Sequence, residues 1–222
     1  MRHRFGVGIA SALALLVGSV FAAQASAAVI TGVTATSNSE YPGINRLAAY
    51  TVDGSGITAG QASNDPFGTM WLSNVGTAVI NPIITFNLGG LYNLTGAQVW
   101  NYNENGGTGR GLSTVTVQEA GTDALFATIG NLTLSQATGL NTYTGQAITL
   151  SGTAQYIRFI NLTSFNSPGA GGINGQSDAL GLSEIQFNGT AFTQNTVPEP
   201  ASLALLMVGA AGVVFIRRRQ QG

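Results

Sequence analysis

Cysteine and lysine are absent from this chain of 222 residues, and its single histidine is His3. Without cysteine the protein has no disulfide, no thiolate nucleophile and no cysteine-ligated zinc. Lysine cannot serve as a base, and His3 lies in a segment that we expect to be removed. A Ser-His-Asp triad, a Cys-His pair and a histidine metal site are therefore excluded from the processed chain. We accordingly predict that the protein is not an enzyme.

Charge is also scarce, because only 8% of the residues are charged and the formal net charge is −1. Five of the eight arginines lie in the end segments, so the middle keeps Arg46, Arg110 and Arg158 against eight acids. An acidic domain does not attract nucleic acid or anionic lipid, so we predict no nucleic-acid partner. The 31 glycines and the many Thr, Asn and Ser residues, with 44% hydrophobic residues, suit a β-rich extracellular protein.

The N-terminal segment has the three parts of a secretory signal peptide. Arg2 and Arg4 make a positive start, residues 5–21 are apolar, and residues 25–27 are small. We predict a signal peptide over residues 1–27, cut after Ala27 by signal peptidase. A retained membrane anchor is the alternative.

Residues 28–193 show the alternation of apolar and polar residues that is typical of a β domain. The strands that we expect cover residues 30–36, 84–88, 94–102, 112–119, 125–129, 132–134, 147–150, 155–162 and 182–187, with a brief helix over 46–52. Strands of this length and spacing predict an all-β fold, namely an antiparallel jelly-roll β-sandwich. Trp71 and Trp100 sit in apolar segments, so we expect both in its core.

Residues 194–222 form a tripartite C-terminal end. Val197, Pro198, Glu199 and Pro200 impose an extended backbone; residues 201–216 are apolar or small, and Arg217, Arg218 and Arg219 follow. A helix over the apolar run would be about 24 Å long, shorter than a hydrocarbon core of ~30 Å. The pattern predicts one short transmembrane helix with its arginines in the cytoplasm and the domain outside. A simple, permanent anchor is the alternative.

This ending closely resembles the PEP-CTERM sorting signal of Gram-negative bacteria. The resemblance implies that the helix anchors the protein only transiently in the inner membrane. It implies that exosortase, a membrane transpeptidase, cuts near the Pro-Glu-Pro motif and releases or transfers the protein to the cell surface or extracellular matrix. It also implies a setting of exopolysaccharide and biofilm-matrix synthesis.

The middle of the chain resembles discoidin-like domains, also called coagulation-factor type C domains. These are galactose-binding-like jelly rolls that include many carbohydrate-binding modules. The resemblance rests on five short segments in the right order and on an Asn-Tyr-Asn-Glu segment followed by Arg-Gly: residues 50–54, 69–71, 84–89, 155–159, 182–187, 101–104 and 110–111. It implies the jelly-roll fold and a binding role, with extracellular polysaccharide as the partner.

The candidate ligand residues lie in two loops, where binding residues of a sandwich usually lie. One loop supplies Asn101, Tyr102, Asn103, Glu104 and Arg110, and the other supplies Asp178. Amides, a guanidinium and carboxylates hydrogen-bond sugar hydroxyls, and Tyr102 could stack on a pyranose face. The alternative is that these residues are ordinary loop composition and that Arg110 fixes its loop to Glu104.

The same resemblance implies a structural Ca²⁺ site with Asp53, Thr69 and Glu184 as ligands, together with carbonyls near Tyr50 and Ser55. Carboxylates, hydroxyls and carbonyls are the oxygen ligands that calcium takes. The loop that leads to Thr69 is longer than in the family's pattern. The alternative is that Asp53 makes an Asx turn and that Glu184 pairs with Arg46 or Arg158.

The function expected from these observations is that of an exported, non-catalytic binding or adhesion module for extracellular polysaccharide. A structural matrix protein without a specific ligand is the first alternative. A polysaccharide-active enzyme is the second, since two carboxylates among Glu104, Asp178 and Glu184 would suffice for a glycosidase.

Overall fold

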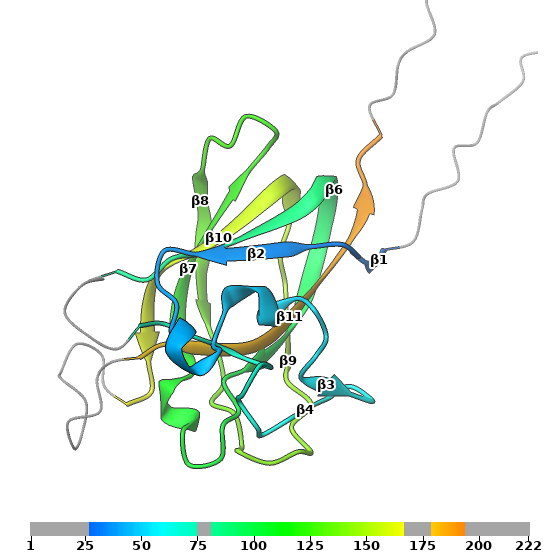
Figure 1. The fold of residues 1–222 in the computed structure, drawn as a ribbon. Coiled ribbons are helices and arrows are strands. Elements are labelled where there is room, and N and C mark those ends of the chain that lie inside the picture. The colour runs from blue at the N-terminus through cyan, green and yellow to red at the C-terminus, as the bar shows by residue number, and fades with distance from the viewer. Residues whose placement is uncertain (1–26, 75–80, 167–178, 194–222) are drawn as a thin grey trace, which may run out of the picture.

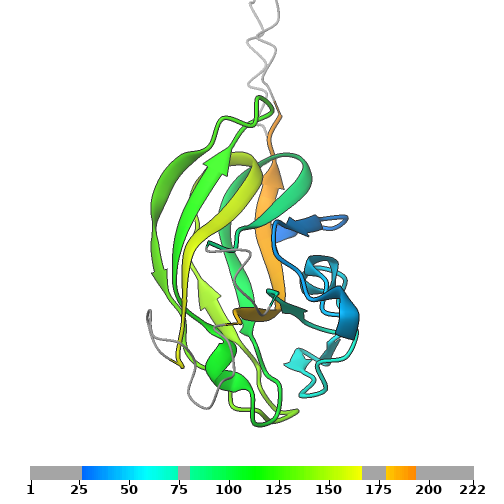
Figure 2. The same ribbon diagram turned by 60° about the vertical axis from the view of Figure 1, so that its left-hand side comes forward.

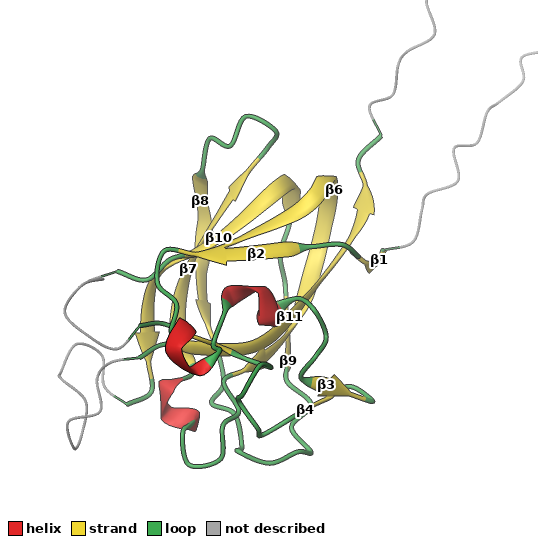
Figure 3. Cartoon of the chain, viewed as in Figure 1, coloured by secondary structure: helices red, strands yellow, loops and turns green. Residues whose placement is uncertain are grey.

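A computed structural model describes residues 27–74, 81–166 and 179–193. The predicted signal peptide up to residue 26, the sorting segment 194–222 and Asp178 lie outside the described residues. None of the helices within the described ranges has the length and hydropathy that a membrane crossing requires. Figure 3 shows that helix is confined to short turns and that strands make up the rest of the regular structure.

Eleven strands and three short 3₁₀ turns follow one another along the described chain. The strands are β1 (Ala28–Val29), β2 (Thr34–Ser37), β3 (Ile57–Thr58), β4 (Gln61–Ala62), β5 (Trp71–Leu72), β6 (Ile84–Asn101), β7 (Leu112–Ala120), β8 (Ala127–Thr133), β9 (Gln146–Ile148), β10 (Gly152–Ser164) and β11 (Gly181–Ala191). The turns are η1 (Pro42–Ile44), η2 (Ala48–Thr51) and η3 (Thr108–Arg110). The helix expected over 46–52 is therefore only the short turn η2.

The strand pairing makes an antiparallel β-sandwich, which confirms the predicted fold. The first half of β6 lies between β2 and β10, and β7 and β8 continue that layer beyond β10. The second half of β6 lies between β9 and β11, and β1 and β5 pair with β11. The two views in Figures 1 and 2 show these layers facing each other.

Strand β6 joins the two layers, which the sequence did not predict. We expected one strand before Gly89 and Gly90 and a second strand after them, but the structure has one strand of 18 residues that includes both glycines. Residues 88–91 lie opposite Gln155 alone, because Asn87 pairs with Tyr156 and Tyr92 pairs with Ala154. Gly89 has a φ of 78°, which an L side chain rarely adopts, so glycine bends the strand here instead of ending it.

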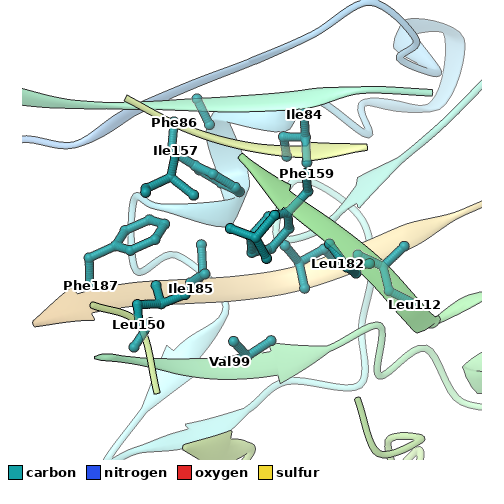
Figure 4. Packing of buried hydrophobic residues seen from close by; sticks show 14 of the residues in the cluster. Ile84, Phe86, Val99, Leu112, Leu150, Ile157, Phe159, Leu182, Ile185 and Phe187 are labelled. Atoms are coloured by element: carbon teal, nitrogen blue, oxygen red, sulfur yellow. The ribbon is translucent and has the colours of Figure 1, made fainter. Parts of the chain in front are cut away.

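The core lies between the layers, because alternate residues of each strand point inward. Phe86 of β6 packs edge-to-face on Phe159 of β10 and on Phe187 of β11, with ring centroids 5.3 and 5.2 Å apart. Figure 4 shows these rings meeting among buried Ile, Leu and Val side chains. Trp71 and Trp100 are also buried, as predicted.

The sandwich has two ends, which we call the tail pole and the loop pole. At the tail pole, β11 ends with Ala191 paired to Tyr92, and β1 pairs through Ala28 with Gly189. At the loop pole, β11 begins beside the end of β6, since Leu182 pairs with Asn101. Figure 1 shows the tail pole at the upper right and the loops at the bottom. The segment between β6 and β7 therefore lies at the opposite end of the sandwich from the C-terminal end of β11.

Candidate functional site

A charged network organises the loop pole around Glu104. Arg110 Nη1 donates to Glu104 Oε2 at 2.5 Å, and Arg46 Nη2 donates to Oε1 at 3.4 Å. The Tyr102 hydroxyl donates to Glu104 Oε2 at 2.8 Å and accepts from Arg46 Nη1 at 2.7 Å. One carboxylate thus lies between two guanidinium groups, and a phenol fixes its orientation.

The short turn after Glu104 depends on glycine. Gly107 N donates to the Glu104 carbonyl at 2.9 Å, and Arg110 N donates to the Gly107 carbonyl at 3.0 Å. A Cβ on Gly107 would lie 2.5 Å from Glu104 Oε2, which is too close for a real contact. The glycine-rich sequence therefore lets the turn fold back until Arg110 meets the carboxylate. This contact is the one that the alternative reading of Arg110, as a residue that fixes its loop to Glu104, had predicted.

Asn101 and Asn103 are buried and act inside the domain. Asn101 Nδ2 donates to the carbonyls of Leu112 and Ser135 at 2.7 and 2.9 Å. Asn103 Nδ2 donates to three carbonyls, and its Oδ1 accepts from Gly139 N at 2.8 Å. These amides hold neighbouring loops together. Their burial contradicts the prediction that they contact a ligand.

Tyr102 is also a correction to the sequence prediction. Its ring is 0% exposed, so it cannot stack on a pyranose. Burial, and next the charge of Glu104, raise the pKa of the Tyr102 hydroxyl above its ordinary value. The phenol therefore stays neutral and donates to Glu104. Its role in the structure is to position that carboxylate.

The partly exposed members of the network are Glu104 and Arg110, whose side chains are each 22% exposed. Phe67, which the sequence analysis did not select, is 65% exposed, and its ring centroid lies 4.9 Å from the Arg46 guanidinium carbon. Arg46 itself is buried. An exposed aromatic between Pro66 and Gly68 in a polar loop was the available signal for Phe67. Nothing local pointed to Arg46 as the partner of Glu104.

A second acidic site lies beside β11. Glu184 is 1% exposed, and Gly54 N donates to its two carboxylate oxygens at 3.1 and 3.3 Å. Burial, and next the charge of Asp53, raise the pKa of Glu184 to about 8, while the Gly54 N–H opposes this shift. The predicted Asx turn is present, because Ser55 N donates to Asp53 Oδ1 at 2.8 Å.

The predicted pairing of Glu184 with an arginine is wrong for the described residues. Arg46 binds Glu104, as above. Arg158 Nε donates to Thr85 at 3.3 Å, and its guanidinium carbon lies 3.5 Å from the Phe126 ring centroid. Glu184 is thus a buried acid without a cationic partner, next to a second acid.

Thr69 comes near the same turn. The Ser55 hydroxyl donates to the Gly68 carbonyl at 3.3 Å, and a Cβ on Gly56 would lie 2.9 Å from the Thr69 carbonyl oxygen. The Thr69 hydroxyl hydrogen-bonds the Asp65 carbonyl. The fold therefore gathers Asp53, Thr69 and Glu184 around one turn. No cluster of three or more acidic or histidine side chains that could hold a metal occurs within ranges 27–74, 81–166 and 179–193.

Comparison with known proteins finds a match for the C-terminal segment and structural similarity for the β domain. The PEP-CTERM protein-sorting motif matches residues 196–219. No curated protein sequence matches the chain. The family 32 carbohydrate-binding module of NanJ from Clostridium perfringens, solved in complex with galactose, is similar with a TM-score of 0.51 and 14% identity over 73% of this chain and 98% of that one.

Two further structures have the same fold. A family 32 module of a family 31 glycoside hydrolase from Clostridium perfringens has a TM-score of 0.53 and 16% identity over 74% of this chain and 95% of its own. The C-terminal domain of a chitobiase from Bacteroides fragilis has a TM-score of 0.53 and 14% identity over 76% of this chain and 100% of its own. At this identity the likeness shows the fold alone: the domain has the β-sandwich fold of these modules, in a chain that carries a PEP-CTERM protein-sorting motif.

Proposed function

We propose that the protein is a non-catalytic carbohydrate-binding module that exosortase sorts to the surface or biofilm matrix of a Gram-negative cell, where it adheres to extracellular polysaccharide. The observation that carries this proposal is the partly exposed pair Glu104 and Arg110, which is joined through Arg46 to the exposed ring of Phe67. A carboxylate and a guanidinium bind sugar hydroxyls, and an aromatic ring covers the C–H face of a pyranose. The NanJ module, which shares the fold, was solved with galactose.

The buried part of the network supports a preorganised site. The buried side chains of Arg46 and Tyr102 donate hydrogen bonds to Glu104. The carboxylate is therefore already ordered before a sugar binds. Asn101 and Asn103 tie the loop to its neighbours. Asp178 remains a proposed ligand contact outside the described residues.

The site also lies at the opposite end of the sandwich from the C-terminal end of β11. Strand β11 runs from the loop pole to the tail pole over 11 residues, which at roughly 3.3 Å per residue makes about 36 Å. An anchor or attachment that follows β11 would therefore join the protein to the membrane or matrix at the end opposite the loop pole. This arrangement suits an adhesion module both before and after exosortase acts.

The surroundings of the carboxylates do not favour the enzyme alternative. A glycosidase needs one carboxyl group that holds a proton and a second that is ionised and accessible. The Glu104 charge is already paired with two arginines, and Glu184, which holds a proton, is only 1% exposed and so does not reach a glycosidic oxygen. The structural-matrix alternative differs only in having no specific ligand, so a binding measurement separates it.

A glycan array probed with the full chain tests the binding function. We expect one class of glycan to bind, and we expect Phe67→Ala and Arg110→Ala to reduce that binding at least tenfold. Arg158→Ala is the matched control, because Arg158 lies in β10 against Phe126. A blank array would favour the structural alternative. Equal losses for Arg110→Ala and Arg158→Ala would place binding elsewhere.

The sorting part has its own test. Replacement of Pro198, Glu199 and Pro200 by alanine in the native host should leave uncleaved protein in the inner membrane. Cell fractionation with immunoblotting measures this, and the unaltered chain is the reference. Normal release of the alanine variant would contradict processing by exosortase.

We further propose that Asp53, Thr69 and Glu184 hold a structural Ca²⁺. Their oxygens fit a hard cation, because buried Glu184, which has no cationic partner among the described residues, lies near the Asp53 carboxylate, and the Thr69 carbonyl lies against the same turn at Gly56. Bound calcium would neutralise both acids and tie the turn after η2 to β11. It would have no part in contacting the sugar.

A further inference from the structure

The hairpin between β7 and β8 ends at the tail pole, as does β11. β7 runs to Ala120, which pairs with Tyr156 near the start of β10, and β8 returns from Ala127. At the same pole, Phe192 N donates to the Leu91 carbonyl at 2.9 Å. Figures 1 and 2 both show the hairpin loop and the end of β11 at the top of the sandwich.

The turn of this hairpin holds Leu125 out into solvent. Leu125 is 74% exposed, which is the largest exposed fraction of any large apolar side chain in the described part of the chain. Ala124 before it has a φ of 55°, in the left-handed region that a residue with a Cβ rarely adopts. The Asp123 carboxylate accepts a hydrogen bond from Leu125 N at 3.2 Å. A strained backbone is thus kept where it exposes an apolar side chain, and such strain is typical of functional sites.

The aromatic residue that follows packs on the domain. The Phe126 ring centroid lies 3.5 Å from the Arg158 guanidinium carbon and 6.4 Å from the Tyr156 ring centroid. Both partners alternate along β10 with buried residues, so they lie on the outer face of the sheet. Leu125 therefore projects from a hairpin whose base is held against the sheet.

The tail pole carries little charge. Five described segments meet there, and their one charged residue is Asp123: 28–33, 88–95, 120–127, 150–156 and 188–193. Glu119 lies next to these segments and has its Oε2 buried. Because the segments contain no arginine, the pole does not attract anionic lipid or an acidic partner. Exposed Leu and Phe side chains instead enter the interfacial region of a bilayer, and Phe192 is 41% exposed.

The C-terminal segment restricts what can reach this pole. Thr193 is the last described residue, and the apolar run that we predict to cross the membrane begins at Ala201. The chain between them spans at most about 28 Å at roughly 3.5 Å per residue. A surface tethered this closely meets the bilayer at a high effective concentration, so a contact of one or two side chains is enough to hold it there.

We propose that the tail pole rests on the surface of the inner membrane while the C-terminal helix is in place, with Leu125 and Phe192 in contact with lipid. The proposal rests on the sorting function proposed above, because that function places the helix in this membrane. Leu125 is a second point of contact apart from the tether, so it fixes the orientation of the domain. The loop pole then points away from the membrane, and the C-terminal end of β11 stays at the headgroups, where a membrane transpeptidase acts.

Quenching of a fluorescent label by lipid tests the contact in the full chain. A host without exosortase retains the tail, and the protein is reconstituted in phosphatidylcholine nanodiscs that contain nitroxide lipid. Because the sequence has no cysteine, Thr122→Cys places the only label on the exposed hairpin turn and leaves Leu125 intact. We expect at least threefold stronger quenching there than for Thr138→Cys, an exposed position of the loop pole. A domain that tumbles freely on its tail would show equal quenching at both labels, which overturns the proposal.

A charge at the contact separates it from the tether. Leu125→Asp in the Thr122→Cys background should reduce the quenching to the level at Thr138. Leu140→Asp, at a loop-pole side chain that is 58% exposed, is the matched control and should leave the quenching unchanged. Circular dichroism checks that both variants are folded, and a folded Leu125→Asp variant with undiminished quenching would contradict the contact.

The same measurement separates this contact from the sorting function. A chain that enters the nanodisc with equal quenching at Thr122 and Thr138 refutes the lipid contact and leaves the sorting proposal standing. A chain that does not enter the bilayer at all refutes both.

Discussion

Glu104 and Glu184 belong to one domain but have opposite electrostatic surroundings. Glu104 is partly exposed and lies between Arg46 and Arg110, with the Tyr102 hydroxyl as a third donor. Glu184 is buried, receives one backbone N–H and lies near Asp53. The first carboxylate is neutralised by the protein itself. The second needs either a proton or a cation from solution, and this difference separates the proposed ligand site from the proposed calcium site.

The largest effect should appear when calcium-free protein is brought from about pH 5 to pH 8. The folded domain holds the Glu184 proton up to a pKa of about 8, whereas the unfolded chain releases it near 4.5. The folded state binds more protons in this window, so the free energy of unfolding is highest below the lower pKa and falls as the pH rises. Urea unfolding in metal-free buffer should show a loss on the order of 4 kcal/mol.

Glu184→Gln is the control for that pH profile. Glutamine keeps the shape of the side chain and has no proton to lose, so the free energy of unfolding should vary much less between pH 5 and 8. Equal slopes for the two proteins would mean that Glu184 is not the titrating group. Glu104→Gln should leave the slope as it is.

Loss of Arg46 from the Glu104 network should cost about 3 kcal/mol at pH 7, because it removes two charged hydrogen bonds, to the Tyr102 hydroxyl and to Glu104, at about 1.5 kcal/mol each. The variant is Arg46→Met, which keeps most of the packing around Phe67 and Tyr102. Arg158→Met is the matched change and should cost less than about 1 kcal/mol, the scale of an exposed cation–π contact. Urea unfolding measures both, and similar costs would mean that Arg46 acts by packing alone.

Calcium should stabilise the wild-type domain by about 2.7 kcal/mol at a concentration 100 times its Kd. Thermal unfolding with calcium and with EGTA at pH 7.5 measures the shift. Glu184→Gln should abolish the calcium response, while Arg46→Met should keep it. A wild-type melting temperature that is the same in calcium and in EGTA would rule out the cation site.

Gly107→Ala should have the smallest effect on stability, about 1 kcal/mol, because the added Cβ would lie 2.5 Å from Glu104 Oε2 and only that carboxylate has to shift. It should nevertheless push that carboxylate away from Arg110 and weaken sugar binding about tenfold, or about 1.4 kcal/mol. Gly43→Ala is the control, since its Cβ would meet nothing within 4 Å. Unchanged binding in Gly107→Ala would argue that Glu104 does not contact the sugar.

The sequence predicted the fold class and much of the core. Alternation along segments such as 112–119 and 182–187 identified strands, and the apolar context of Trp71 and Trp100 identified buried residues. It failed at Gly89 and Gly90, where a glycine pair was interpreted as the end of a strand. Glycine permits either a turn or a bend, and only the pairing of β6 with both β10 and β11 selects the bend.

The site was less predictable than the fold. The segment 101–104 was selected for its polar residues, but Asn101, Tyr102 and Asn103 face inward and only Glu104 reaches the surface. Arg46 lies 58 positions before Glu104, and no local pattern connects the two. Polar residues in a loop bind either a ligand or the loop's own backbone, and the choice depends on neighbours that are distant in sequence.

The sequence by itself determined what chemistry is missing and where the chain carries its sorting motif. The sequence has no cysteine or lysine, one histidine (His3) and a sorting motif at 196–219. These properties do not depend on how the chain folds. Only the tertiary structure decided which carboxylate has cationic partners and which end of the sandwich carries the loops. These depend on contacts between β6, β10 and β11 and on Arg46 reaching Glu104, because electrostatic effects act between residues that are close in space.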